Sequence, residues 1–236
     1  MAATASRKRL PASVFTQRAS VKAVFLSVLA AGAMLLPVSA QDTNATARLT
    51  IAKAPAKHLW SDDVVGSGYL RGAKEAGIAI GGGVAAPRVG NKSLHDLLLA
   101  KIHYGWVFSD VQAKGKWYAG NWALLEEVFV GGQVYPVTHY VVGETTLLRY
   151  SLTTGTRWVP FADGGIGILA TSIANPDLGS PGEFNGQGGL GVNYFWRDDV
   201  AFYVQYRFTH YSNANIRSPN QGLNDHMFYV GVTWLF

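Results

Sequence analysis

A histidine and a serine two residues apart, His210 and Ser212, have the residue types of a nucleophilic hydrolase. An imidazole beside a hydroxyl can accept its proton, so that the serine oxygen attacks an acyl carbonyl. Residues two apart in a β-strand point to the same side of the sheet. That side also carries four large apolar residues, Phe202, Val204, Tyr206 and Phe208. In a soluble protein such a pair would be buried away from any substrate, whereas in a membrane barrel it would face lipid.

Alternating segments separated by turns fill the chain from Gly77 to Phe236. In the segment 97–108, one face is apolar throughout, while Lys101 and His103 lie on the other. Strands of about ten residues with one apolar and one polar face are typical of outer-membrane barrels. The predicted strands are roughly 77–86, 97–109, 117–130, 138–152, 157–171, 184–197, 200–213 and 225–236. They predict an all-β fold, an eight-stranded antiparallel transmembrane β-barrel of the bacterial outer membrane, over residues 77–236.

A soluble β-sandwich shows the same alternation, but three features argue against it. Tyrosine and tryptophan gather near the strand ends, as in the aromatic girdles of membrane proteins. The opposite faces are rich in Asn, Gln and Gly and carry isolated charges, which suit a small polar lumen. The chain also ends on Phe236 after a series of alternate apolar residues, and this ending resembles the C-terminal assembly signal of bacterial outer-membrane proteins.

The first 76 residues lie outside the predicted barrel. Basic residues precede an apolar run from Ala23 to Val38 and small residues up to Ala40, so residues 1–40 have the organisation of a secretory signal peptide. Residues 41–76 are weakly patterned and are predicted to be a loosely ordered extension. The formal net charge of +5 resides entirely in the first forty residues, which leaves a neutral mature chain without a basic stripe for nucleic acid. The absence of cysteine excludes disulfides and thiolate metal sites.

Shorter and longer connections alternate between the predicted strands. The short ones lie around 110–116, 153–156 and 198–199, and the longer ones around 87–96, 131–137, 172–183 and 214–224. Outer-membrane barrels have short periplasmic turns and long outer loops, so both termini are predicted to be periplasmic. His210 and Ser212 then lie at the outer end of the seventh strand and face the leaflet that is built from lipopolysaccharide.

The residues around this pair carry a family resemblance. The sequence reads His210-Tyr211-Ser212-Asn213-Ala214, followed by Pro219-Asn220-Gln221-Gly222-Leu223 and a terminal strand. This pattern resembles the PagL family of lipid A 3-O-deacylases. The resemblance implies an outer-membrane serine esterase that hydrolyses the ester-linked 3-hydroxyacyl chain at position 3 of lipid A, without a metal or another cofactor. An outer-membrane phospholipase and a catalytically inert structural barrel are the alternatives, and the phospholipase family is a larger, twelve-stranded barrel.

Two residues depart from the pattern of the family. Asn224 stands where its best-known members have the glutamate of the triad, and Asn215 stands where they often have glycine. Outer-membrane phospholipase A, which the site also resembles, uses an Asn with its His-x-Ser pair. Asn224 is therefore predicted to orient His210 through its amide oxygen. Strand parity argues against the neighbouring Asp225, which would point into the barrel.

Other residues are predicted to bind the substrate. Asn213 and a backbone N–H group of 214–215, which includes Asn215, would stabilise the oxyanion. Arg217, in the loop that joins the two strands of the site, and Arg88 and Lys92, in the neighbouring first outer loop, would bind the phosphates of lipid A. Ordinary solvated loop charges are the alternative for these three residues. The predicted partner is lipopolysaccharide of the outer leaflet, and the sequence allows a homodimer without deciding the oligomeric state.

The remaining titratable residues are assigned to structure. Four acidic residues of the predicted strands are expected to pair with Lys101, Arg149 or Arg207 inside the lumen, because a buried charge needs a partner: Glu126, Glu127, Glu144 and Asp163. Five histidines show no metal-ligand spacing and are assigned to surface or lumen packing: His58, His95, His103, His139 and His226.

Overall fold

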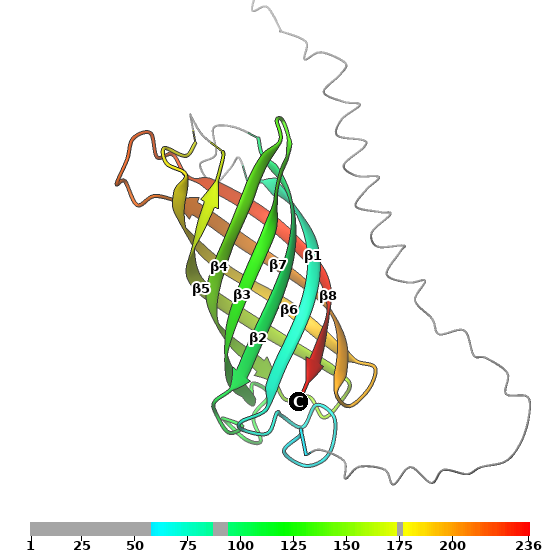
Figure 1. The fold of residues 1–236 in the computed structure, drawn as a ribbon. Helices are drawn as coiled ribbons and strands as arrows, with labels where there is room; N and C mark the ends of the chain where they lie inside the picture. The colour runs from blue at the N-terminus through cyan, green and yellow to red at the C-terminus, as the bar shows by residue number, and fades with distance from the viewer. Residues whose placement is uncertain (1–57, 87–93, 174–176) are drawn as a thin grey trace, which may run out of the picture. The chain divides into compact units, whose positions relative to one another are not determined.

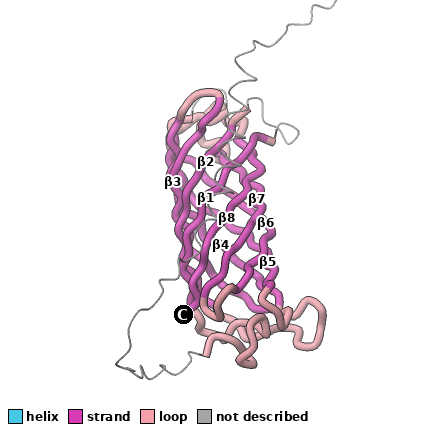
Figure 2. Tube along the Cα trace, turned by 90° about the vertical axis from the view of Figure 1, so that its right-hand side faces the viewer, coloured by secondary structure: helices cyan, strands magenta, loops and turns pink. Residues whose placement is uncertain are grey.

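The computed structural model describes residues 58–86, 94–173 and 177–236. The predicted signal peptide, 1–40, lies outside them. In this described part, eight antiparallel strands form a sheet that closes on itself, because β8 pairs with β1 as well as with β7 (Figure 1, Figure 2). The strands are β1 (Lys74–Ala85), β2 (Asp96–Val107), β3 (Gly120–Tyr135), β4 (His139–Leu152), β5 (Trp158–Thr171), β6 (Gly182–Phe195), β7 (Val200–Ser212) and β8 (Leu223–Leu235). The predicted eight-stranded barrel is confirmed.

The largest difference from the predicted boundaries lies in β3, which continues to Tyr135. The long loop predicted around 131–137 is therefore wrong, because most of it is strand. A Cβ atom on Gly131 would lie 2.1 Å from the carbonyl oxygen of Leu98, and one on Gly132 would lie 2.0 Å from that of His139. Glycine permits this close approach of neighbouring backbones, so the strand continues where the side-chain alternation stops.

The barrel has two different ends. At the terminal end, β1 begins and β8 ends, and Lys74 and Phe236 exchange two backbone hydrogen bonds of 2.8 Å. We call the opposite end the loop end. It carries the connections 86–95, 136–138, 172–181 and 213–222. Within the described residues, no helix is long and apolar enough to cross a membrane.

Residues 58–73, which precede β1, pack against the terminal end of the barrel. The ring of Trp60 meets that of Phe195 edge to face at 4.8 Å. The backbone N–H of Tyr69 donates to Asn121 Oδ1 at 2.8 Å. Because β1 begins at Lys74, the predicted boundary at residue 77 lies inside the first strand.

Side chains alternate between the inside and the outside of the barrel. In β7, Tyr203 and Arg207 are buried, while Phe202 and Val204 are exposed. The outer surface carries many large apolar side chains, and aromatic rings pair across neighbouring strands near the terminal end. Trp158 and Tyr194, for example, have ring centroids 4.6 Å apart. This outer surface matches the apolar band that membrane barrels present to lipid.

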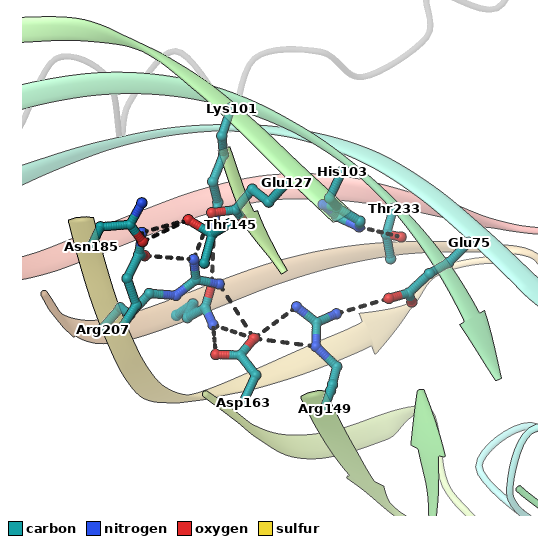
Figure 3. A network of polar contacts seen from close by, with 12 residues as sticks. Glu75, Lys101, His103, Glu127, Thr145, Arg149, Asp163, Asn185, Arg207 and Thr233 are labelled. Atoms are coloured by element: carbon teal, nitrogen blue, oxygen red, sulfur yellow. Dashed lines mark hydrogen bonds and ion pairs between the residues drawn. The ribbon is translucent and has the colours of Figure 1, made fainter. Parts of the chain in front are cut away.

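A network of buried charges occupies the lumen near the middle of the strands (Figure 3). Glu127 forms ion pairs with Arg207 at 2.6 Å and with Lys101 at 2.8 Å. Asp163 Oδ2 accepts from both Arg207, at 3.3 Å, and Arg149, at 3.0 Å. The pairing that the sequence predicts is therefore confirmed for Glu127 and Asp163. Each of these four charged residues of the network, Lys101, Glu127, Asp163 and Arg207, has a counter-charge within reach, as a low-dielectric interior requires.

Two of the four acidic residues do not join this network, and the prediction is wrong for them. Glu126 and Glu144 share the outward parity of Leu124 and Val142, so their side chains lie on the outer surface. Glu126 accepts hydrogen bonds of 2.9 and 3.0 Å from the hydroxyl of Thr146, which is also on that surface. The charge pattern alone does not show whether such a residue points inward or outward, because a shift of one residue in the register reverses the side.

Candidate active site

The end of β7 and the start of β8 bring three predicted site residues together at the loop end. His210 pairs with Asn224 of β8 on one side and with Gly186 of β6 on the other. Ser212, two residues further along β7, pairs with Phe184. Directly paired residues of adjacent strands point to the same side of a sheet. The side chains of His210, Ser212 and Asn224 therefore all belong to the outer surface of the barrel.

These three side chains form a continuous series of hydrogen bonds. His210 Nδ1 lies 2.8 Å from Asn224 Oδ1, and His210 Nε2 lies 3.0 Å from Ser212 Oγ. An amide oxygen only accepts, so Nδ1 carries the ring proton and Nε2 presents its lone pair to the serine hydroxyl. This tautomer is the one that a general base needs. The arrangement can activate the serine oxygen for attack on an acyl carbonyl.

Asp225 takes no part in this arrangement. Its side chain points into the barrel, as strand parity predicts, and it is completely buried. Neither of its carboxylate oxygens has a hydrogen-bond partner among the described residues. The group that contacts the imidazole of His210 from β8 is the amide of Asn224.

The loop between β7 and β8 covers one edge of the imidazole. Gly222, the last residue of this loop, has a φ of 76°, in the left-handed region. A Cβ atom at this position would lie 2.8 Å from His210 Cε1. Glycine meets both requirements, since it adopts the left-handed backbone freely and allows the chain to lie against the ring. The position of this loop therefore determines how the imidazole is packed.

A tight turn follows the serine. Ala214 and Asn215 have φ values of 53° and 64°, and the N–H of Ile216 donates to the carbonyl oxygen of Asn213 at 3.0 Å. Asparagine tolerates the left-handed region better than most residues, which accounts for its use at 215. No hydrogen bond within the described part of the chain uses the backbone N–H groups of Ala214 or Asn215. Both donors are free to bind a ligand.

Asn213 is tied into the same loop. Its N–H donates to Asn220 Oδ1 at 3.0 Å, and its side-chain oxygen accepts from the N–H of Arg217 at 3.4 Å. Asn220 in turn donates from Nδ2 to Asn215 Oδ1 at 3.1 Å. The side chain of Asn213 is only 2% exposed. Its amide oxygen therefore stabilises the turn from the buried side. The backbone donors of the next two residues belong to the exposed part of the turn.

An apolar groove opens beside the serine on the outer surface. Its volume is about 460 Å³, and it is lined by residues of β5, β6 and β7, namely Ile166, Gly167, Ile168, Phe184, Asn185, Gly186, His210 and Ser212. Gly186 lies between the strands of Ile166 and His210, and no atom lies within 4 Å of the position that its Cβ would take. The missing side chain leaves room for an extended apolar group next to the serine oxygen.

A second, more polar pocket of about 310 Å³ shares Ile168 and Phe184 with this groove. Ser180, Glu183, Asn213 and Arg217 contribute its polar groups. Arg217 is exposed, and none of the ion pairs found among the described residues involves it. Arg88 and Lys92, the other two predicted phosphate ligands, lie outside the described residues. Among the residues that are described, no group of three or more His, Asp or Glu side chains gathers into a possible metal site.

Sequence comparison assigns the chain to a family. A sequence model of the lipid A 3-O-deacylase (PagL) family matches residues 99–233, which is more than half of the chain. The chain belongs to this family. The matched region contains His210, Ser212 and Asn224, so the three residues that meet on the outer surface lie within the part that is characteristic of PagL proteins. No curated protein sequence matches the chain.

Comparison with solved structures supports the barrel fold. The chain is similar to the outer membrane enzyme PagL, with 18% identity over 66% of this chain and 97% of that one and a TM-score of 0.47. It is also similar to Neisserial surface protein A, with 13% identity over 70% and 100% of the two chains and a TM-score of 0.55. At such low identity the second likeness speaks for the barrel fold alone, and the family match carries the assignment.

The sequence does not reveal one buried polar pair at the loop end. His95, just before β2, and Asp177, in the loop between β5 and β6, are in contact at 2.9 Å, and both are buried. From the sequence, His95 is assigned to packing, and Asp177 has no predicted role. Their separation of 82 residues leaves no local pattern that could join them. The only signal is Asn175-Pro176-Asp177, which is ordinary turn chemistry.

The third residue of the site can be tested directly. Asn224→Ala is expected to lower the rate of lipid A hydrolysis by about ten- to a thousandfold, because His210 loses its orienting partner while the nucleophile is kept. Asn224→Glu is expected to preserve or raise this rate, since it restores a carboxylate at the same position. Release of the fatty acid from lipid A, followed by mass spectrometry, measures both effects. Asp225→Ala is the matched control, and a loss of activity there with a silent Asn224→Ala would contradict the proposed orientation.

Proposed function

We propose that this PagL-family protein is a serine esterase that removes the 3-hydroxyacyl chain at position 3 of lipid A, with His210 and Ser212 as its catalytic pair. The observation that carries the proposal is the uninterrupted hydrogen-bond series from Asn224 through His210 to Ser212 Oγ, with distances of 2.8 and 3.0 Å. Membership of the lipid A 3-O-deacylase family supports the substrate. The position of the site on the apolar outer surface supports a lipid rather than a soluble ester.

The proposal includes an orientation in the membrane. The loop end faces the outside of the cell and the terminal end faces the periplasm, so that the serine lies near the headgroups of the outer leaflet. Short turns on the periplasmic side and longer loops outside are typical of these barrels. The loop connections 172–181 and 213–222 fit this orientation, while the terminal turn 108–119 is longer than the typical one. A homodimer stays a prediction.

The proposed reaction proceeds in two halves. His210 Nε2 takes the proton of Ser212 as its oxygen attacks the ester carbonyl, and the tetrahedral oxyanion forms. Collapse of this intermediate breaks the bond to the sugar oxygen, which leaves with the proton from His210. A water molecule then gives a proton to His210 and attacks the acyl-serine carbonyl. The bond to Ser212 Oγ breaks, this oxygen takes the proton back from His210, and the fatty acid leaves. Asn224 holds the imidazole in the tautomer that both halves need.

The oxyanion requires donors that are already in place. The backbone N–H groups of Ala214 and Asn215 are the donors we assign to it, because they lie directly after the nucleophile and are unused within the described structure. Asn213 supports them, because its side-chain oxygen accepts from the N–H of Arg217 and its own backbone N–H donates to Asn220 Oδ1. The assignment of Asn213 as a direct donor, which the sequence analysis makes, is retained as a proposal that needs its Nδ2 to turn toward the substrate.

Each of the two pockets would bind a different part of the substrate. The apolar groove over Gly186 would take the acyl chain, with its carbonyl carbon beside Ser212 Oγ. The polar pocket that contains Arg217 would take the phosphorylated sugar. Arg88 and Lys92 are also proposed to bind phosphate.

The first test removes the catalytic pair. Ser212→Ala and His210→Ala should each lower the release of the 3-hydroxyacyl group by at least about a thousandfold. Both side chains face outward and support no core, so the folded barrel should persist, as seen by its heat-modifiable migration in gels. The measurement is mass spectrometry of lipid A from cells that express each variant. Near wild-type release by either variant would exclude the serine mechanism.

The same experiment separates the alternatives. Loss of one 3-hydroxyacyl group from lipid A with the wild-type protein supports the deacylase. Unchanged lipid A with newly formed lysophospholipid would instead indicate a phospholipase. Neither product, from a barrel that is shown to be folded, would indicate an inert structural protein.

A second test fills the groove. Gly186→Val should lower hydrolysis of long-chain esters by about ten- to a hundredfold, since displacement of the chain moves the carbonyl out of line with the serine oxygen. Hydrolysis of a short acetyl ester should change little. Ala100→Val is the matched control, because Ala100 also faces outward but lies on β2, away from the groove. Equal losses with long and short esters would show that the acyl chain does not lie over Gly186.

A third test concerns the headgroup. Arg217→Ala should raise the apparent KM for bis-phosphorylated lipid A by about fivefold, as expected for an exposed ionic contact. A dephosphorylated analogue should show a smaller change, and the reactivity of Ser212 with a small soluble ester should be unchanged. Equal losses on both lipid substrates would mean that Arg217 shapes the loop and does not bind phosphate.

A further inference from the structure

The buried pair His95 and Asp177 joins distant loops at the loop end of the barrel. His95 Nε2 lies 2.9 Å from Asp177 Oδ2, and the side chains are 6% and 1% exposed. The other ring nitrogen, Nδ1, contacts the amide oxygen of Gln133, whose own amide nitrogen donates to the carbonyl oxygen of Val137 at 2.7 Å. Each ring nitrogen thus contacts a side-chain oxygen, one of Gln133 and one of Asp177. The pair ties the start of β2, the β3–β4 hairpin and the β5–β6 loop into one unit.

The same aspartate also holds the loop that covers the catalytic imidazole. The backbone carbonyl oxygen of Asp177 accepts hydrogen bonds from the N–H groups of Gln221, at 3.0 Å, and Gly222, at 3.1 Å. Gly222 is the residue whose backbone lies against His210 Cε1. A chain of contacts therefore runs from His95 through the side chain and then the backbone of Asp177 to Gly222, and from there to the ring of His210.

The residues next to Asp177 are tightly packed against the β7–β8 loop, so a shift of Asp177 would move that loop as well. Leu178, next to Asp177, is 1% exposed and belongs to the core cluster that also contains Tyr211 and Leu223. Gly179 lies so close to the β7–β8 loop that a Cβ atom there would be 2.2 Å from the carbonyl oxygen of Pro219. Interiors of this density move as units rather than deforming locally. A change in the position of Asp177 would therefore displace residues 219–222 together.

We propose that His95 and Asp177 form a positioning unit for the active site, which fixes Gly222 against the imidazole of His210 and so holds His210 in line with Ser212. Neither residue touches Ser212 or either pocket, so both act through the loop rather than on the substrate. The proposal rests on the proposed function, because it assigns to these residues a task in the His210–Ser212 reaction.

The physical need for such a unit follows from the third residue of the site. Asn224 orients His210 with one neutral hydrogen bond, and an uncharged partner holds an imidazole less firmly than a carboxylate does. A further contact beside this bond, at Cε1, must then come from packing. Gly222 supplies this contact, and its own position depends on the two hydrogen bonds to Asp177.

The experiment compares Asp177→Ala and His95→Ala with the wild-type protein in detergent. The readouts are the labelling rate of Ser212 by a small fluorophosphonate and the kcat and KM for lipid A. Each variant should lose about ten- to a hundredfold in labelling rate and in kcat, with little change in KM, as expected when a base is displaced by a fraction of an ångström. The ¹⁵N signals of the His210 ring should shift in both variants.

Conservative and double variants separate positioning from loss of structure. Asp177→Asn keeps an acceptor for His95 and should recover most of the labelling rate. His95→Ala combined with Asp177→Ala should be no slower than the slower single variant, because both remove the same contact. The matched control is Asp63→Ala, which removes the exposed His58–Asp63 pair of the same chemistry, 2.8 Å apart, and should leave all readouts unchanged.

The outcomes are distinguishable from a failure of the proposed function. If Ser212→Ala abolishes labelling and hydrolysis while folded Asp177→Ala and His95→Ala react at the wild-type rate, the positioning unit is refuted and the esterase stands. If these variants change KM and leave kcat and labelling unchanged, the pair shapes substrate binding and the proposal is likewise refuted. If Ser212→Ala is fully active, the proposed function itself fails.

Discussion

Closure of the sheet is the constraint on which the rest of this structure depends. A barrel has no free edge, so the pairing of β8 with β1 fixes the register of all strands relative to one another. Register in turn decides the side to which each residue points. Thr209 and Tyr211 of β7 are buried in the lumen, while His210 and Ser212 between and after them face outward. The site on the outer surface is therefore a consequence of parity in a closed sheet.

The buried charges in the lumen stabilise the observed register, in which His210 and Ser212 point outward. A slip of β7 by one residue would move Arg207 onto the apolar outer surface and turn His210 and Ser212 into the lumen. Arg207 is completely buried and bound to both Glu127 and Asp163, and breaking a buried ion pair on one side costs about 3–5 kcal/mol. The network thus disfavours the register in which no site exists. Its member Arg207 lies on β7, the strand that also carries His210.

Features that depend on residues near one another in the sequence could be predicted, and features that depend on distant residues could not. Alternation within a strand is local, so the number of strands, the outward parity of His210 and Ser212, and the inward parity of Asp225 could be read from the chain. The length of β3 could not, because Gly131 and Gly132 interrupt the alternation while their backbones still pair. Glu126 was assigned to the wrong side because the two adjacent glutamates differ only in register.

Contacts between loops could not be predicted for a different reason. The pair of His95 and Asp177 joins residues 82 positions apart that are brought together by closure of the barrel. No periodicity extends across loops, and both residues have ordinary alternative roles, in packing and in turns. The two pockets were also absent from the sequence analysis, since they arise where an outward glycine of β6 lies beside larger residues of β5 and β7.

The amide of Asn224 fits the environment in which the site lies. A carboxylate at this position would place a negative charge on the outer surface of a membrane barrel, where charged groups are costly. It would also stabilise the imidazolium that forms during the reaction, and an amide does so less well. Asn224 retains the orienting hydrogen bond without the cost of the charge. Under the proposed function, the catalytic power that an amide gives up at this position would be recovered by a more rigid placement of His210, which a loop packed onto the barrel core can provide. The proposed positioning unit would then make the connections at the loop end part of the catalytic arrangement, together with the strands that carry it.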